Sequence, residues 1–159
     1  MEILQEGDIL MLQQIRIGKS FVEVDLAKTR EFYSKDIEVC NCLYCKNYIE
    51  ASKVLATSVS EIFNKLGVLP TKPAELSEFP AEEAGVRLYI GDYHLVGRVL
   101  EGELCTSSNF NELNTFKVEN FTFGFSEDLA SVPEGFPSPV LQLNFVANIP
   151  WILTENPDD

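Results

Sequence analysis

Three cysteines, Cys40, Cys42 and Cys45, lie within one stretch of six residues in this sequence. Structural zinc is held by four ligands in a tetrahedron, and thiolate sulfur is among the ligands that zinc prefers. A fourth ligand would come from Cys105 or from His94, which is the only histidine in the chain. One interpretation of the spacing is therefore a metal site, with zinc as its cofactor.

The same cysteines fit two other roles. A helix that begins near Cys42 would direct its free amides at the thiols and lower their pKa, which suits a redox pair of Cys42 and Cys45. Small, partly buried cysteines also fill the tight corner between a strand and a helix, and in that role they need no cofactor. We base the functional prediction on this packing role and keep zinc binding or thiol redox chemistry as the alternative.

His94 is the other residue with chemical potential. On a strand it points to the face opposite Tyr93, where a histidine is typically hydrogen-bonded and structural. A cysteine paired with His94, and oriented by Asp36 or Asp92, would make a hydrolase if the side chains came within hydrogen-bond reach. The sequence contains no phosphate-binding loop, zinc-protease helix motif, calcium loop or serine-elbow motif. We therefore predict a domain without catalysis.

Residues 41–67 carry the pattern of one long helix. Apolar side chains recur at spacings of three and four, which places them on one stripe that would face a sheet. Asn41 would cap the first turn, Gly67 would end the helix in the left-handed conformation, and Pro70 would prevent its continuation. The stripe consists of Tyr44, Tyr48, Ala51, Leu55, Val59, Ile62 and Leu66.

Apolar and alternating segments on either side of this helix predict β-strands. Gly91-Asp92 predicts a tight hairpin turn, and residues 68–85 predict a long connection. Because one helix cannot supply repeated parallel crossovers, we predict a single α+β domain over residues 1–159. Its antiparallel or mixed sheet of six or seven strands would pack against the long helix. The predicted strands are residues 9–17, 21–26, 32–39, 86–90, 93–104, 116–125 and 140–149.

The charge of the chain is strongly and unevenly acidic. Its 159 residues include 12 basic and 25 acidic side chains, which give a net charge of −13. Residues 66–159 contain 4 basic and 15 acidic side chains (−11), whereas residues 1–65 contain 8 and 10 (−2). Such a field repels phosphate backbones and anionic lipids. We predict a binding or inhibitory module whose partner is a basic protein, and neither a nucleic acid nor a membrane.

The hydropathy of the chain and the charges near residue 1 predict its cellular location. No run approaches the roughly 20 apolar residues of a membrane span. Glu2, Glu6 and Asp8 stand where a signal peptide would carry positive charge. We therefore predict a cytoplasmic protein, in which the cysteines stay reduced.

Four blocks of sequence remain to be placed: CxxCxN[YF] at residues 42–48, KPAE at 72–75, GxYHxVG at 91–97 and a Pro-Trp block at 149–153. Together they resemble a group of small uncharacterised bacterial proteins that share these blocks. The resemblance brings no function with it, but it implies that the blocks lie in one region. The residues it assigns to that region are Cys42, Cys45, Asn47, Tyr93, His94 and Trp151.

Overall fold

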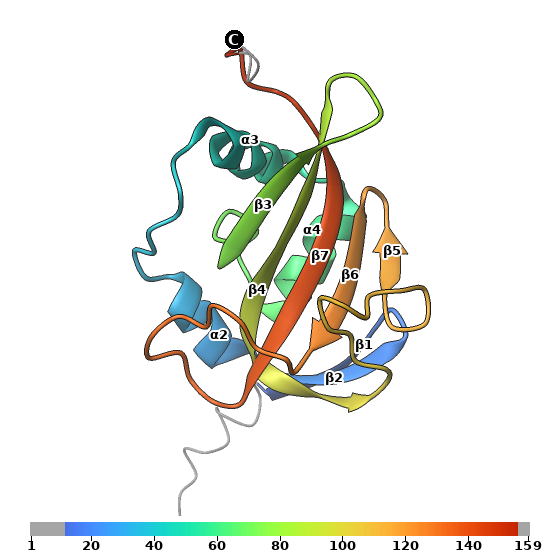
Figure 1. The fold of residues 1–159 in the computed structure, drawn as a ribbon. Helices are drawn as coiled ribbons and strands as arrows, with labels where there is room; N and C mark the ends of the chain where they lie inside the picture. The colour runs from blue at the N-terminus through green and yellow to red at the C-terminus, as the bar shows by residue number, and fades with distance from the viewer. Residues whose placement is uncertain (1–11, 156–159) are drawn as a thin grey trace, which may run out of the picture.

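The structure is a computed structural model that describes residues 12–155. In this part of the chain, seven strands form one antiparallel sheet, in the order β1-β2-β4-β7-β6-β5, with β3 paired to β4 beside this path (Figure 1). The predicted α+β class with an antiparallel sheet is confirmed. The strands are β1 (Leu12–Ile17), β2 (Ser20–Asp25), β3 (Glu75–Pro80), β4 (Val86–Glu101), β5 (Phe116–Val118), β6 (Phe121–Ser126) and β7 (Val140–Pro150).

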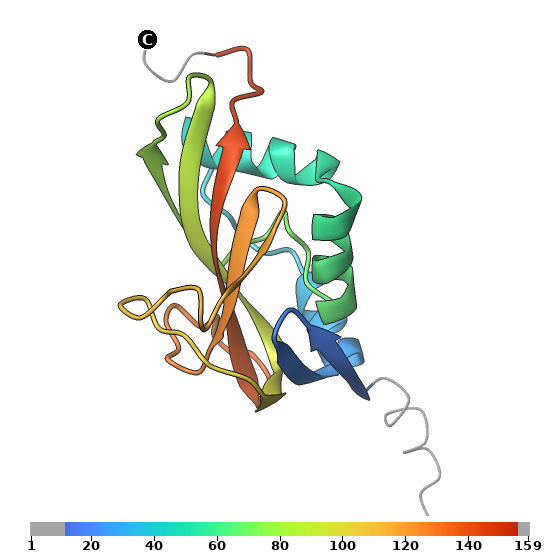
Figure 2. The ribbon, with the colours of Figure 1, turned by 90° about the vertical axis from the view of Figure 1, so that its right-hand side faces the viewer.

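The helices of the described chain cover one face of this sheet. Figure 2 shows α2 (Leu26–Tyr33), α3 (Leu43–Ala51) and α4 (Thr57–Leu66) on the same side, and the loops that precede β5 and β7 on the other. The core lies between the helices and the sheet and is rich in aromatic rings. Its largest buried side chains are Tyr48, Phe63, Tyr89, Tyr93, Phe121, Phe123, Phe125 and Phe145.

The prediction of one long helix over residues 41–67 is wrong. The segment forms α3, a short 3₁₀ turn, η1 (Ser52–Val54), and α4, because Leu55 and Ala56 adopt extended backbone angles. α3 begins after Cys42 rather than after Asn41, and the Cys42 side chain makes no capping hydrogen bond. The break lets both halves of the apolar stripe follow the twisted sheet. Gly67 ends α4 with a φ of 77°, as predicted.

The predicted hairpin turn at Gly91-Asp92 is also wrong, because both residues lie in the middle of β4. β7 pairs with β4 from Val86 to Val96, so the strand has a partner along this whole length and does not turn. Close packing between strands, rather than a turn, explains why residue 91 is a glycine. A Cβ atom at residue 91 would overlap the carbonyl oxygen of Glu75 on β3, so only glycine permits the close approach of these two strands.

Three further predictions need correction. Residues 32–39 are not a strand: Asp25 accepts a hydrogen bond from the Lys28 amide (3.0 Å) and starts α2, which extends to Tyr33, and residues 35–39 form no helix or strand. The connection 68–85 contains β3, and the strand predicted over 116–125 is the hairpin of β5 and β6. The strand predicted over 140–149 is confirmed as β7. Residues 9–11 of the first predicted strand, and Glu2, Glu6 and Asp8, lie outside the described residues.

The helices of the described chain are short. Within residues 12–155, none of the helices has the length and apolar character needed to cross a bilayer.

Candidate functional site

Two regions carry the chemically active side chains of the described chain, and the first is the corner before α3. The sulfur atoms of Cys40, Cys42 and Cys45 all lie within 4.8 Å of one another. Cys40 and Cys42 are exposed, whereas Cys45 lies in the first turn of α3 and is buried. We call this group of three residues the thiol corner.

The thiols of this corner differ in acidity. The Cys42 amide donates a hydrogen bond to the Cys40 sulfur (N to Sγ, 3.5 Å), which lowers the pKa of the Cys40 thiol. Burial acts in the opposite direction on Cys45 and raises the pKa of its thiol. The Cys40 thiol therefore ionises at a lower pH than the Cys45 thiol, and a nearby positive charge would favour the Cys45 thiolate.

The geometry suits a metal ion of zinc's size. A tetrahedral zinc ion with Zn–S bonds of about 2.3 Å holds its sulfurs about 3.8 Å apart, so the three sulfurs need only a small movement. A hollow of about 220 Å³ lies beside them, lined also by Glu38, Glu75 and Leu76. This hollow gives an ion and its fourth ligand access to the buried thiol.

The other two predicted ligands lie elsewhere. The buried Cys105 lies on the far face of the sheet, where the Asn144 amide donates to its sulfur (3.8 Å) and burial raises the pKa of its thiol. His94 is buried against Gln142, at 3.0 Å from ring Nε2 to amide Oε1. Neither belongs to the thiol corner. Within the described chain, the His94 ring forms no hydrogen bond with a cysteine. The Cys–His pair that a hydrolase would need is therefore not formed there.

Asn47 and Trp151 form a clasp between α3 and the end of β7. The Asn47 side chain donates to the carbonyl oxygen of Pro150 (3.1 Å) and accepts from the Ile152 amide (2.8 Å), so it holds the chain on both sides of Trp151. The Trp151 ring packs edge-on against Tyr44 of α3, with centroids 5.9 Å apart. Asn47 thus has a structural role next to the thiol corner.

Tyr93 lies deeper in the core, although it is joined to the same helix. Its hydroxyl donates to the carbonyl oxygen of Pro70 (2.7 Å) and is 2.5 Å from the hydroxyl of Tyr48, the residue after Asn47. Burial raises the pKa of both tyrosines far above the ordinary value. Both therefore stay neutral and act as hydrogen-bonding parts of the core.

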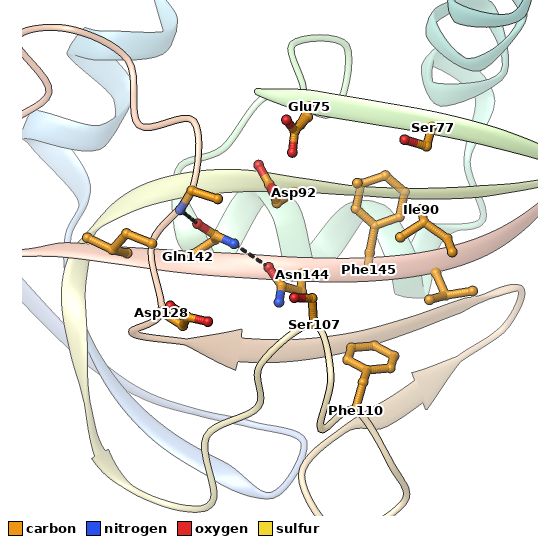
Figure 3. A pocket seen from close by; sticks show the side chains of 14 residues that line it. Glu75, Ser77, Ile90, Asp92, Ser107, Phe110, Asp128, Gln142, Asn144 and Phe145 are labelled. Carbon is orange, nitrogen blue, oxygen red and sulfur yellow. Dashed lines mark hydrogen bonds between the residues drawn. The ribbon is translucent and has the colours of Figure 1, made fainter.

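The second region is a cavity of about 390 Å³ on the sheet face opposite the helices, which we call the sheet pocket (Figure 3). Strands β3, β4 and β7 form its floor, and the loops before β5 and β7 form its walls. Apolar side chains of Ile90, Phe110 and Leu129 contribute to it. Its polar lining consists of Glu75, Ser77, Asp92, Ser107, Asp128, Gln142 and Asn144.

Strand register assembles this polar lining. Asp92 of β4 lies directly between Glu75 of β3 and Asn144 of β7, and His94 lies opposite Gln142 in the next row of the same face. Figure 3 shows the carboxylates of Glu75 and Asp92 pointing toward each other. Burial raises the pKa of Asp92 to about 7, and the negative charge of Glu75 adds to this shift.

Hydrogen bonds fix the amide side chains of the pocket. Gln142 Oε1 accepts from the Ala130 amide (2.7 Å), and Gln142 Nε2 donates to Asn144 Oδ1 (2.7 Å). Because Oε1 is an acceptor, His94 donates to it through Nε2, and its Nδ1 has no hydrogen-bond partner among residues 12–155. Burial lowers the pKa of His94, which favours this neutral form.

Polar side chains recur at every second residue of two strands, at 92 and 94 and again at 142 and 144. That alternation is the sequence signal for the sheet pocket, and only the pairing of β4 with β7 reveals that the two pairs are neighbours.

No protein-family model, curated protein or solved structure matches this chain. The arrangement provides two kinds of chemistry: soft-metal coordination at the thiol corner and recognition of a positive charge in the sheet pocket.

Proposed function

We propose that this protein binds zinc through Cys40, Cys42 and Cys45. The observation that carries the proposal is the mutual distance of the three sulfur atoms, all within 4.8 Å. Three thiolates satisfy three of the four positions of a tetrahedral zinc ion. The fourth position faces the neighbouring hollow, where water or a ligand from a partner completes the coordination.

The proposed zinc ion would attach segment 34–42 to α3. Residues 34–42 form no helix or strand, and they connect α2 to α3. One end is held by Lys72, whose ammonium group donates to the carbonyl oxygens of Tyr33 (2.9 Å) and Lys35 (2.8 Å). Zinc at the thiol corner would hold the other end to the first turn of α3. The positive charge of the ion would also favour the thiolate of the buried Cys45.

Cobalt titration tests this proposal. Reduced, metal-free protein is titrated with Co²⁺, and the thiolate-to-cobalt absorption band is recorded. We expect one equivalent to saturate the band, and we expect Cys40→Ser, Cys42→Ser or Cys45→Ser to weaken binding by about 10–100-fold or more. Cys105→Ser is the matched control and should leave the titration unchanged.

Absence of the band in the reduced wild-type protein would contradict zinc binding. If the protein instead formed a reversible disulfide between Cys42 and Cys45 in the absence of metal, thiol redox chemistry would replace zinc binding as the function of this corner.

The sheet pocket and the charge support a second proposed function, binding of a basic protein. The observation behind it is a pocket with three carboxylates in a chain of net charge −13. Electrostatic attraction of this kind accelerates association and weakens as salt is added. A pull-down with basic proteins at rising ionic strength tests it, and capture that does not change with salt would contradict it.

A further inference from the structure

The sheet pocket has a chemical bias that its volume alone does not explain. Its lining contains three carboxylates, from Glu75, Asp92 and Asp128, and none of the fourteen described residues that line it is Lys, Arg or His. The Ser131 hydroxyl donates to Glu75 (2.8 Å) and holds this carboxylate in place. The pocket is therefore a preformed acceptor of positive charge.

Burial of the Asp92 carboxylate has a cost in folding free energy. Only 6% of the residue is exposed, and one of its two carboxylate oxygens has no hydrogen-bond partner within the described chain. It also lies directly opposite Glu75 in the β3–β4 pairing, where like charges destabilise a sheet. A buried, unpaired acceptor beside a second carboxylate is typical of a ligand site rather than of a scaffold.

We propose that the sheet pocket binds a guanidinium group, with Glu75 and Asp92 as its carboxylate partners. The inference rests on the proposed binding of a basic protein and names the group that is recognised. A guanidinium ion is planar and directs several N–H donors at carboxylates, which suits two acceptors that lie side by side. It is also the most weakly hydrated of the basic side-chain ions, so it enters a buried site at least cost.

The rest of the pocket suits the methylene stem and the backbone of an arginine. Ile90 and Leu129 line the cavity and are each 42% exposed, so they present apolar surface at its mouth. The Phe110 ring also lines the cavity and offers a surface for the stem. An arginine side chain that projects from a basic partner fits this combination of apolar walls and a charged floor.

Calorimetry with two nearly isosteric ligands tests the proposal. Nα-acetyl-arginine amide carries the guanidinium ion, whereas Nα-acetyl-citrulline amide has a similar shape without the charge. At pH 8, where Asp92 is ionised, we expect the arginine compound to bind at least tenfold more tightly. Equal affinities, or no detectable binding of either compound at millimolar concentration, would overturn the proposal.

Variants identify the residues responsible. Glu75→Gln and Asp92→Asn should each weaken binding of the arginine compound at least tenfold. Glu61→Gln removes one negative charge from the exposed face of α4 and should leave binding unchanged. Circular dichroism confirms that each variant is folded. If Glu61→Gln weakened binding as much as the pocket variants, the effect would be due to net charge, and the proposed site would be wrong.

A hexa-arginine peptide separates this inference from the broader proposal. If the peptide bound the wild-type protein and both pocket variants with the same salt-dependent affinity, the pocket would not be the site, although the binding of basic partners would stand. If hexa-arginine bound more than tenfold more tightly to the wild-type protein than to Glu75→Gln, both would be supported. If Nα-acetyl-arginine amide bound as tightly as the peptide, the guanidinium site would be supported, and the rest of a basic partner would contribute nothing to affinity.

Discussion

The thiol corner and the sheet pocket differ in how far apart their residues lie in the sequence. Cys40, Cys42 and Cys45 are neighbours in the chain, and their sulfurs meet where the preceding segment enters α3. The pocket instead joins residues 75, 92 and 144, which become neighbours only when β3, β4 and β7 pair in register. Local sequence thus builds a corner in which two of the three cysteines are exposed, whereas strand register builds a polar pocket floor in which Asp92 and Gln142 are buried.

The two regions therefore respond differently to pH, ligands and substitutions. In the proposed function, the thiol corner depends on a bound zinc ion and on segment 34–42, which forms no helix or strand. The sheet pocket depends on the stability of the sheet itself. Each of the following experiments perturbs one of the two regions.

The largest expected effect is the pH dependence of stability caused by Asp92. Its pKa is about 7 in the folded protein and near 3.8 when unperturbed. Between these values the folded state keeps the proton and the unfolded state loses it, so rising pH favours unfolding. From pH 4 to pH 8 we expect the wild-type protein to lose about 3–4 kcal/mol of unfolding free energy relative to Asp92→Asn. Urea denaturation of both proteins at each pH measures this difference, and a constant difference would contradict the account.

Zinc should change the dynamics of the thiol corner and leave the pocket unchanged. At a zinc concentration about 100 times the dissociation constant, bound metal contributes about 2.7 kcal/mol, which slows local opening about 100-fold. Amide hydrogen exchange should therefore slow in residues 38–46 and stay the same in β7. Cys42→Ser should remove the protection. Equal protection of both regions would indicate that zinc acts on the whole fold.

Gly91→Ala should damage the pocket and leave the three thiols in place, although β3 also lines the hollow beside them. The added Cβ overlaps the Glu75 carbonyl oxygen, so β3 must move away from β4, at a cost of about 2 kcal/mol. Gly85→Ala is the control, because a Cβ there meets no atom within 4 Å and only the φ of +80° is strained. Urea denaturation gives the stabilities, and cobalt titration should show unchanged metal binding in both variants. Loss of cobalt binding in Gly91→Ala would mean that the two regions are coupled.

The smallest effect concerns the thiols themselves. The pKa of Cys40 is lowered by the Cys42 amide, and burial raises the pKa of Cys45 and of Cys105. Because the thiolate is the reactive form, Cys40 should react with iodoacetamide about tenfold faster than Cys45 or Cys105 in the reduced, metal-free protein. Peptide mapping by mass spectrometry gives the rates. Equal rates would contradict the proposed difference in acidity.

The same contrast explains which features could be predicted from the sequence. The cysteine spacing and Gly67 act over one or two turns of chain, so the thiol cluster and the end of α4 follow from local patterns. Gly91-Asp92 has the composition of a turn, but the β7 partner is fifty residues away and holds the segment straight. The break at Leu55 and Ala56 likewise depends on packing against the twisted sheet, which the apolar periodicity does not record.

The sheet pocket could be predicted least. Asp92 and His94 alternate with core residues on one strand, and Gln142 and Asn144 do so on another, but their meeting depends on strand order and register. Those are long-range properties of the fold. Fourth ligands from Cys105 or His94 could not be judged from the sequence for the same reason, and the structure places both residues on the pocket side of the sheet.

The proposed zinc ion is held by three thiolates near the start of α3. Elemental analysis of protein purified under reducing conditions without chelators tests it most directly. We expect close to one zinc ion per chain in the wild-type protein and in Cys105→Ser, and much less in Cys42→Ser. A wild-type protein that contains no zinc and takes up none when zinc is supplied would contradict it.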